Sequence, residues 1–127
     1  MKTVKLRQFT DDRGSLVENT LASIMDSSKH FFISKSKPGV IRGNHYHKHK
    51  SEWFYIIQGT CKMIVKDMNT GTLDEKIIKD TDNFIVYVLP DQVHAFENVG
   101  KNEMILIALV NEVLDHDNPD TYRYKIM

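Results

Sequence analysis

Hydrophobic and polar residues alternate with a period of two along much of the chain. Lys2–Phe9 places Val4 and Leu6 on one side and charged residues on the other, the pattern of a half-buried strand. Phe84–Leu89 is instead a continuous apolar run ended by Pro90, which predicts a core strand. Further strands are predicted at Phe31–Ser34, Val40–Tyr46, Trp53–Gln58, Cys61–Lys66, Lys76–Lys79, Ala95–Val99 and Met104–Val110.

Turn residues separate these segments, and helical periodicity is almost absent. Asp11, Asp12 and Gly14 predict one turn, and Gly59 with Thr60 predicts a tight hairpin. Thr20–Ser28 has apolar residues at helical spacing but is short, so we expect a single turn of helix there. About ten short strands with turn signals between them predict an all-β sandwich or barrel.

Composition limits the classes of partner. A chain of 127 residues is expected to fold as one domain over residues 1–127. Because 17 basic residues balance 17 acidic ones, no overall field would attract nucleic acid or an anionic membrane. The single cysteine, Cys61, cannot form an internal disulfide and is expected to be a small strand residue. No signal-peptide core or long apolar stretch is present, so a cytoplasmic location is expected.

Three histidines and a glutamate are concentrated between Gly39 and Gly59. In a strand, residues i and i+2 share a face, so His45 and His47 present two imidazoles about 6–7 Å apart. Glu52 has the wrong parity for that face, which predicts a bend within the polar run Lys48–Ser51. The alternative is that His45 and His47 are paired histidines on a solvated strand and bind no metal. If a closed barrel adds His94, the set suits Zn²⁺, Fe²⁺, Mn²⁺ or Ni²⁺.

This stretch resembles the first motif of the cupin superfamily, in which glycine, an HxH pair, glutamate and glycine recur at fixed spacing. The matching residues are Gly39, His45, His47, Glu52 and Gly59. Pro90, His94 and Asn98 resemble the second motif, without its usual internal glycine. The resemblance implies a jelly roll, the double-stranded β-helix of a cupin barrel, with a divalent transition metal held by His45, His47, Glu52 and His94; zinc is the first expectation.

Two further stretches resemble sugar-nucleotide cupins. Residues 11–14, DDRG, are similar to a segment of dTDP-sugar 3,5-epimerases and 3,4-ketoisomerases, which implies that Arg13 holds a nucleotide sugar. The alternative is that Arg13 pairs with Asp11 or Asp12 at the turn. The tail, with NPDTY at residues 118–122, resembles the end of the cupin domain of a bifunctional capsular-polysaccharide enzyme. Arg42 matches an arginine of the family and, with Lys48, could contact a diphosphate; Lys50 is expected to be a surface lysine.

The implied reaction is proton transfer next to the ketone of a nucleotide-linked 4-keto-6-deoxy sugar. Return of the proton to the other face of C3 is epimerisation, and its return to C4 is 3,4-ketoisomerisation. His45 or His47 could be the base; if both bind metal, His49, Tyr46 or Tyr87 must be considered. Related ketoisomerases usually have glutamine where this chain has Glu52, which favours a metal and epimerisation.

Two other classes of function stay open: an iron-dependent dioxygenase, and a module that binds metal or sugar without turnover. We also expect a homodimer, because so many strands leave edges that must be covered. In related cupins the amino-terminal segment reaches the partner.

Overall fold

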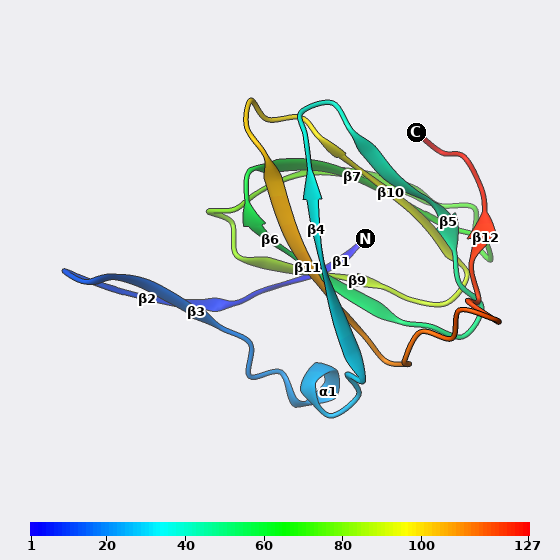
Figure 1. The fold of residues 1–127 in the computed structure, drawn as a ribbon, viewed down its shortest axis with the longest axis horizontal. Helices are drawn as coiled ribbons and strands as arrows, with labels where there is room; N and C mark the ends of the chain where they lie inside the picture. The colour runs from blue at the N-terminus through cyan, green and yellow to red at the C-terminus, as the bar shows by residue number, and fades with distance from the viewer.

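The computed structural model describes residues 1–127 as two five-stranded antiparallel sheets that face each other, with a separate hairpin (Figure 1). The first sheet has the order β1 (Lys2–Lys5), β9 (Phe84–Val88), β6 (Glu52–Gln58), β11 (Met104–Val110) and β4 (His30–Ser36). The second has the order β12 (Tyr122–Arg123), β5 (Ile41–Tyr46), β10 (Gln92–Asn98), β7 (Thr60–Asp67) and β8 (Leu73–Lys79). Neighbours in these orders are mostly distant in sequence, as in a jelly roll.

The main core lies between the two sheets and is built from alternate residues of their strands. In β11, Met104, Leu106, Ala108 and Val110 are buried while the residues between them are half-buried. Cys61 lies in this core, and burial raises the pKa of its thiol to about 12, so it stays protonated at neutral pH. The expected jelly roll is confirmed, and Cys61 is a small strand residue.

The amino-terminal strand is shorter than its alternation predicted. It breaks at Leu6, whose N–H donates to the carbonyl of Asn83 at 2.7 Å, and the chain then enters β2 (Arg7–Asp11). β2 pairs only with β3 (Gly14–Glu18), a strand that the sequence did not predict. These two strands form a hairpin arm that projects from the barrel (Figure 1).

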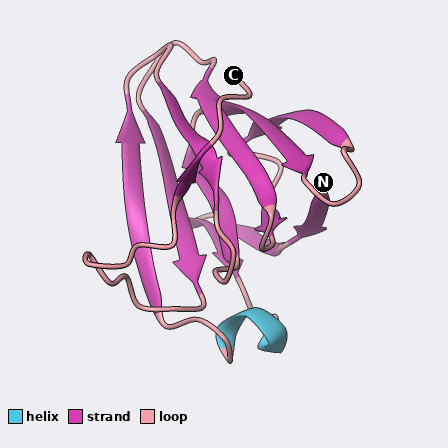
Figure 2. Cartoon of the chain, turned by 90° about the vertical axis from the view of Figure 1, so that its right-hand side faces the viewer, coloured by secondary structure: helices cyan, strands magenta, loops and turns pink.

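A second apolar cluster lies on the outer face of the first sheet, beside the root of the arm. Its buried members are Leu6, Ile24, Trp53, Ile85 and Tyr87. Of the predicted helix only α1 (Ala22–Met25) forms, and it contributes the fully buried Ile24 to this cluster. Figure 2 shows that the rest of the regular structure is strand. No helix is long and apolar enough to cross a membrane.

Candidate functional site

Four side chains that are distant in sequence converge inside the barrel. β10 pairs with β5 so that His94 lies opposite His45, while His47 follows β5 and Glu52 begins β6. The candidate ligand atoms of these four residues all lie within 4.8 Å of one another. Glu52 Oε1 is 2.7 Å from His47 Nε2 and 3.3 Å from His94 Nε2. Three imidazoles and one carboxylate at this separation fit a single divalent transition metal.

The bend that re-aims Glu52 is held by the carboxyl-terminal tail. The carboxylate of Asp120 accepts the backbone N–H groups of Lys48, His49 and Lys50 at 3.0, 2.9 and 3.2 Å. Burial opposes ionisation of Asp120, but these three donors outweigh it and keep the pKa of that carboxyl below its usual range. The backbone carbonyl of Asp120 accepts the Nδ1–H of His47 at 2.7 Å, which leaves the His47 Nε2 facing Glu52.

A bulge in β5 decides which side chains face the cluster. His45 lies opposite His94 and Gly43 opposite Ala95, so Asn44, with φ of 55°, is an extra residue in the strand. Gly43 also has a positive φ of 92°, and a Cβ there would lie 2.6 Å from the carbonyl oxygen of His94. Beyond the bulge Arg42 lies opposite Phe96, an inward-facing residue of β10.

The electrostatics distinguish His45 from His47. Burial lowers the pKa of His45 to about 4, with the charge of the neighbouring histidines acting in the same direction, so His45 is neutral near pH 7. Burial also opposes protonation of His47, but the hydrogen bond to Glu52 outweighs it and raises the pKa of His47. Burial likewise opposes ionisation of Glu52, yet hydrogen bonds from His47 and His94 lower the pKa of its carboxyl. In the metal-free site the electrostatics therefore favour a buried imidazolium–carboxylate pair between His47 and Glu52, beside a His45 that is neutral near pH 7.

A cavity of about 610 Å³ opens above this cluster. Aromatic rings of Phe32, Phe54 and Phe96 line it together with His45, Glu52 and His94. Its cationic residues are Lys35, Arg42 and Arg123, all exposed, and Glu52 is the only acid in its lining. The volume is that of a small-molecule site, and the charges at its mouth favour an anionic ligand.

The structure brings some predicted site residues to the cavity and leaves others outside. His45 and Arg42 line it. Tyr46 points away and stacks on Tyr122 with 5.3 Å between ring centroids, and the Lys48 ammonium lies 4.4 Å from the centre of the same Tyr122 ring. Exposed His49 does not line the cavity. The placement of these last three residues gives their predicted catalytic or binding roles no support.

Three more residues lie in surroundings that differ from those expected for them. Tyr87 packs against Trp53 in the outer cluster, away from the cavity. Arg13 lies on the arm, where its guanidinium bonds the carboxylate of Asp11 at 2.6 and 3.1 Å, as the alternative interpretation predicted. The expectation for Lys50 was wrong: it is buried, and its ammonium is satisfied by the carbonyl of Pro119, to which it donates at 2.6 Å.

The sequence did not single out three residues that shape the site: Asn44, Asp120 and Arg123. Their roles depend on pairing between β5 and the tail, which no local pattern reveals. The one available signal was the tail motif at residues 118–122, which contains Asp120 and directly precedes Arg123.

Fold and cluster together define the chain as a cupin, and comparison with known proteins gives its family. A family model described as the polysaccharide biosynthesis C-terminal domain matches residues 9–122. The chain belongs to this family. It is 36% identical over 113 residues to UDP-2-acetamido-2,6-beta-L-arabino-hexul-4-ose reductase of Pseudomonas aeruginosa, covering 89% of this chain and 30% of that protein. It is 25% identical to TDP-4-oxo-6-deoxy-alpha-D-glucose-3,4-oxoisomerase of Aneurinibacillus thermoaerophilus, covering 98% and 94%.

Solved structures agree with this assignment. The capsular polysaccharide assembling protein CapF of Staphylococcus aureus superposes with a TM-score of 0.74 at 30% identity, over 95% of this chain and 34% of CapF. The dTDP-4-dehydrorhamnose 3,5-epimerase of Bacillus anthracis shares the fold, with a TM-score of 0.83 at 20% identity over 95% of this chain and 76% of that one. The chain spans about a third of the length of CapF and of the P. aeruginosa reductase.

Proposed function

We propose that this chain catalyses proton transfer next to the ketone of a nucleotide-linked 4-keto-6-deoxy sugar, with epimerisation at C3, in surface polysaccharide biosynthesis. The observation that carries the proposal is the cluster of His45, His47, Glu52 and His94 at the base of a cavity whose mouth is cationic. The named substrates of the P. aeruginosa and A. thermoaerophilus relatives, nucleotide-linked oxo sugars, support this substrate class.

We assign a divalent metal, zinc first, to His47, Glu52 and His94. Histidines that bind metals almost always donate their second ring N–H to a fixed acceptor. His47 has such an acceptor in the Asp120 carbonyl at 2.7 Å, and His94 in the Gln92 carbonyl at 3.2 Å. A ring nitrogen of His45 lies within the same 4.8 Å, and if it completed the set, His45 would not be available as a base. When bound, such an ion supplies Lewis-acid polarisation of a carbonyl.

We assign the proton transfer to His45. Neither of its ring nitrogens has a hydrogen-bond partner, and it is the least buried of the four cluster residues. Its lowered pKa keeps it neutral at pH 7, so it can accept the C3 proton and return it. Packing against His47 and His94, with ring centroids 5.0 and 4.7 Å away, orients its imidazole.

Hydrogen exchange in D₂O tests the activity. The protein is incubated with dTDP- and UDP-linked 4-keto-6-deoxy sugars in the presence of zinc, and deuterium is located by NMR. Deuterium at C3 with the ketone still at C4 is expected. His45→Gln should slow exchange about 10²–10⁴-fold and keep its zinc content. His47→Ala should lose both the exchange activity and the zinc. Loss of zinc from His45→Gln would instead make His45 a ligand and leave the base unassigned.

The 3,4-ketoisomerase is the second candidate, supported by similarity to the A. thermoaerophilus oxoisomerase over nearly the whole chain. It would place deuterium at C4 and move the ketone to C3. No exchange with any of these sugars would contradict both isomerase assignments and leave a binding module. Oxygen consumption by anaerobically purified, iron-loaded protein would indicate a dioxygenase.

We also propose a homodimer formed through the arm and the outer face of the first sheet. Phe9 and Leu16 are paired across the arm and are 43% and 58% exposed, which supports a covering partner. Light scattering at micromolar concentration should give twice the mass of one chain. Leu16→Asp should give monomer, whereas Leu73→Asp, at a comparably exposed leucine of β8, should not. A monomeric wild-type protein would contradict the proposal.

A further inference from the structure

The end of the tail is fixed against β5 by one residue, Asn44. Its backbone carbonyl accepts the N–H of Tyr124 at 2.9 Å, and its side-chain oxygen accepts the N–H groups of Ile126 and Met127 at 2.9 and 3.0 Å. Lys66 adds a hydrogen bond to the Tyr124 hydroxyl at 2.9 Å. Because Asn44 is the bulged residue, the distortion of β5 that turns Arg42 inward also positions the tail.

This pairing places Arg123 directly opposite His45. In the two-residue ladder Tyr122 pairs with Tyr46 and Arg123 pairs with His45. The tyrosines stack on the outer face of the sheet, so Arg123 and His45 share the face that lines the cavity. The guanidinium of Arg123 makes no hydrogen bond or ion pair within the chain, so all five of its N–H donors are available to a ligand.

Arg42 reaches the same cavity with part of its guanidinium already fixed. Its Nε donates to Ser36 Oγ at 2.9 Å and its Nη2 to the carbonyl of Lys35 at 3.3 Å, which leaves other donors free. The one carboxylate in the lining, Glu52, is already engaged by His47 and His94. The mouth of the cavity thus carries positive charge that no group of the chain neutralises.

We propose that Arg123 is a substrate-binding residue that, with Arg42, holds the diphosphate of the nucleotide-linked sugar. The assignment rests on the proposed function for its substrate class. Both arginines are exposed at the mouth of the cavity, where a hydrated diphosphate can be bound, whereas the base of the cavity is buried and suits the uncharged sugar. A planar guanidinium matches the bidentate geometry of phosphate oxygens.

Calorimetry with nucleoside diphosphates tests the assignment. Wild-type protein should bind UDP or dTDP, and Arg123→Gln should weaken that binding about 10-fold to 100-fold, the usual loss for a hydrogen bond to a charged group. Lys125→Gln removes an exposed cation of the same tail that does not line the cavity, and should bind like wild type. Uridine and thymidine, which lack phosphate, should not distinguish Arg123→Gln from wild type.

A second variant tests the route by which Arg123 reaches the cavity. Asn44→Gly keeps a residue that tolerates positive φ but removes the amide that holds the tail. It should weaken diphosphate binding as Arg123→Gln does, and the double variant should lose little more. Arg123→Lys should bind the diphosphate more tightly than Arg123→Gln but less tightly than wild type, because lysine restores the charge but not the bidentate guanidinium geometry.

Kinetics separate this inference from the activity on which it rests. Arg123→Gln should raise KM for the sugar nucleotide with kcat nearly unchanged. Two outcomes would overturn the role of Arg123. In the first, wild type exchanges sugar hydrogen and Arg123→Gln has the same KM as wild type. In the second, wild type binds neither UDP nor dTDP. Diphosphate binding that depends on Arg123 without exchange of sugar hydrogen would overturn the proposed activity alone.

Discussion

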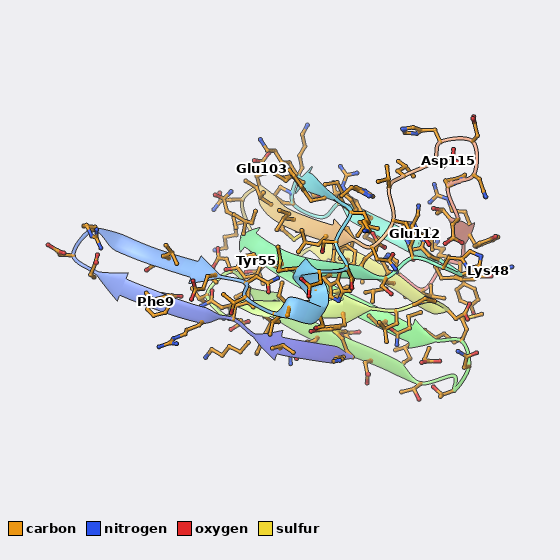
Figure 3. The ribbon with its side chains drawn as sticks, turned by 90° about the horizontal axis from the view of Figure 1, so that it is seen from below. Phe9, Lys48, Tyr55, Glu103, Glu112 and Asp115 are labelled. Atoms are coloured by element: carbon orange, nitrogen blue, oxygen red, sulfur yellow. The ribbon has the colours of Figure 1, made fainter.

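Two segments extend from the barrel, the β2–β3 arm and the tail after β11, and they differ in how the rest of the chain holds them. The arm's polar contacts are nearly all internal, apart from a bond of 2.6 Å from the Asn83 amide to Gln8. The tail is bound at two points of the site, through Asp120 to the bend after His47 and through Asn44 at the β5 bulge. Figure 3 shows Phe9 on the arm at one end of the molecule and Lys48, beside the tail, at the other.

Each segment carries an arginine, and comparing the two shows what a motif alone does not reveal. Arg13 belongs to the segment that resembles sugar-nucleotide cupins, yet its charge is paired with Asp11 and it is 86% exposed, away from the cavity of its own chain. Arg123 matches no quoted motif but is unpaired and faces the cavity beside His45. Within one chain, pairing register, and not the motif, indicates which arginine faces the cavity.

Of the changes in these two segments, releasing the tail at Asp120 has the largest expected effect. Asp120→Ala removes the acceptor of three backbone N–H groups, so the bend that aims His47 and Glu52 should loosen. Zinc affinity, measured by competition with a chromophoric chelator, should fall about 10-fold to 100-fold, as for other outer-shell groups of metal sites. The melting temperature should fall by about 3–8 °C.

The matched control for this experiment is Asp117→Ala, in the same tail. Its side chain is exposed and makes no hydrogen bond to the site, so zinc affinity should stay at the wild-type value. Equal zinc affinity in Asp120→Ala and Asp117→Ala would show that the tail does not position the metal ligands.

A smaller effect is expected from pH, through His47. Its pKa is raised, so in metal-free protein the imidazolium–Glu52 pair stabilises the fold below the ordinary pKa of about 6.5 and loses that contribution as pH rises through the raised value. A metal requires neutral imidazole, so binding should release a proton below the raised pKa. Zinc affinity should increase with pH by at most about tenfold per unit and then level off.

Calorimetry in buffers of different ionisation enthalpy measures this proton release directly. His49→Ala, which removes an exposed histidine outside the cluster, should release the same number of protons as wild type. Zinc binding at pH 6 with no proton released would contradict the ion pair between His47 and Glu52.

The sequence was sufficient to predict an all-β sandwich or barrel from local alternation, and its resemblance to the cupin motifs implied the jelly roll and the four clustered residues. Alternation marked the strands, and the spacing of His45, His47 and Glu52 required a bend whose existence the structure confirms. The prediction of His94 required only that the sheets close into a barrel, which brings β10 beside β5. The break at Leu6 was not predictable in the same way, because it depends on a hydrogen bond to Asn83, distant in sequence.

The rule that alternate residues of a strand share a face also failed in β5, where the strand is irregular. Arg42 is three residues before His45 and would lie on the opposite face of a regular strand, yet the Asn44 bulge turns both toward the cavity. Positive φ at a non-glycine residue costs energy and has no certain signal in the sequence. The buried position of Lys50 likewise depends on Pro119, a contact across 69 positions.

The smallest expected effect is that of Arg13→Gln on the arm. The Arg13–Asp11 pair is exposed to solvent on both sides, and such pairs add little to stability. The midpoint of urea unfolding should therefore match wild type, and so should that of Arg7→Gln, whose guanidinium packs on Phe9 in the same arm at 4.7 Å. Because Arg13 does not line the cavity of its own chain, we expect it to affect KM by reaching the site of a second copy. If Arg13→Gln raises KM in the dimer but has no effect on KM in the monomeric Leu16→Asp background, that route is established. If Arg13→Gln still raises KM in the monomer, the arm folds back onto its own barrel.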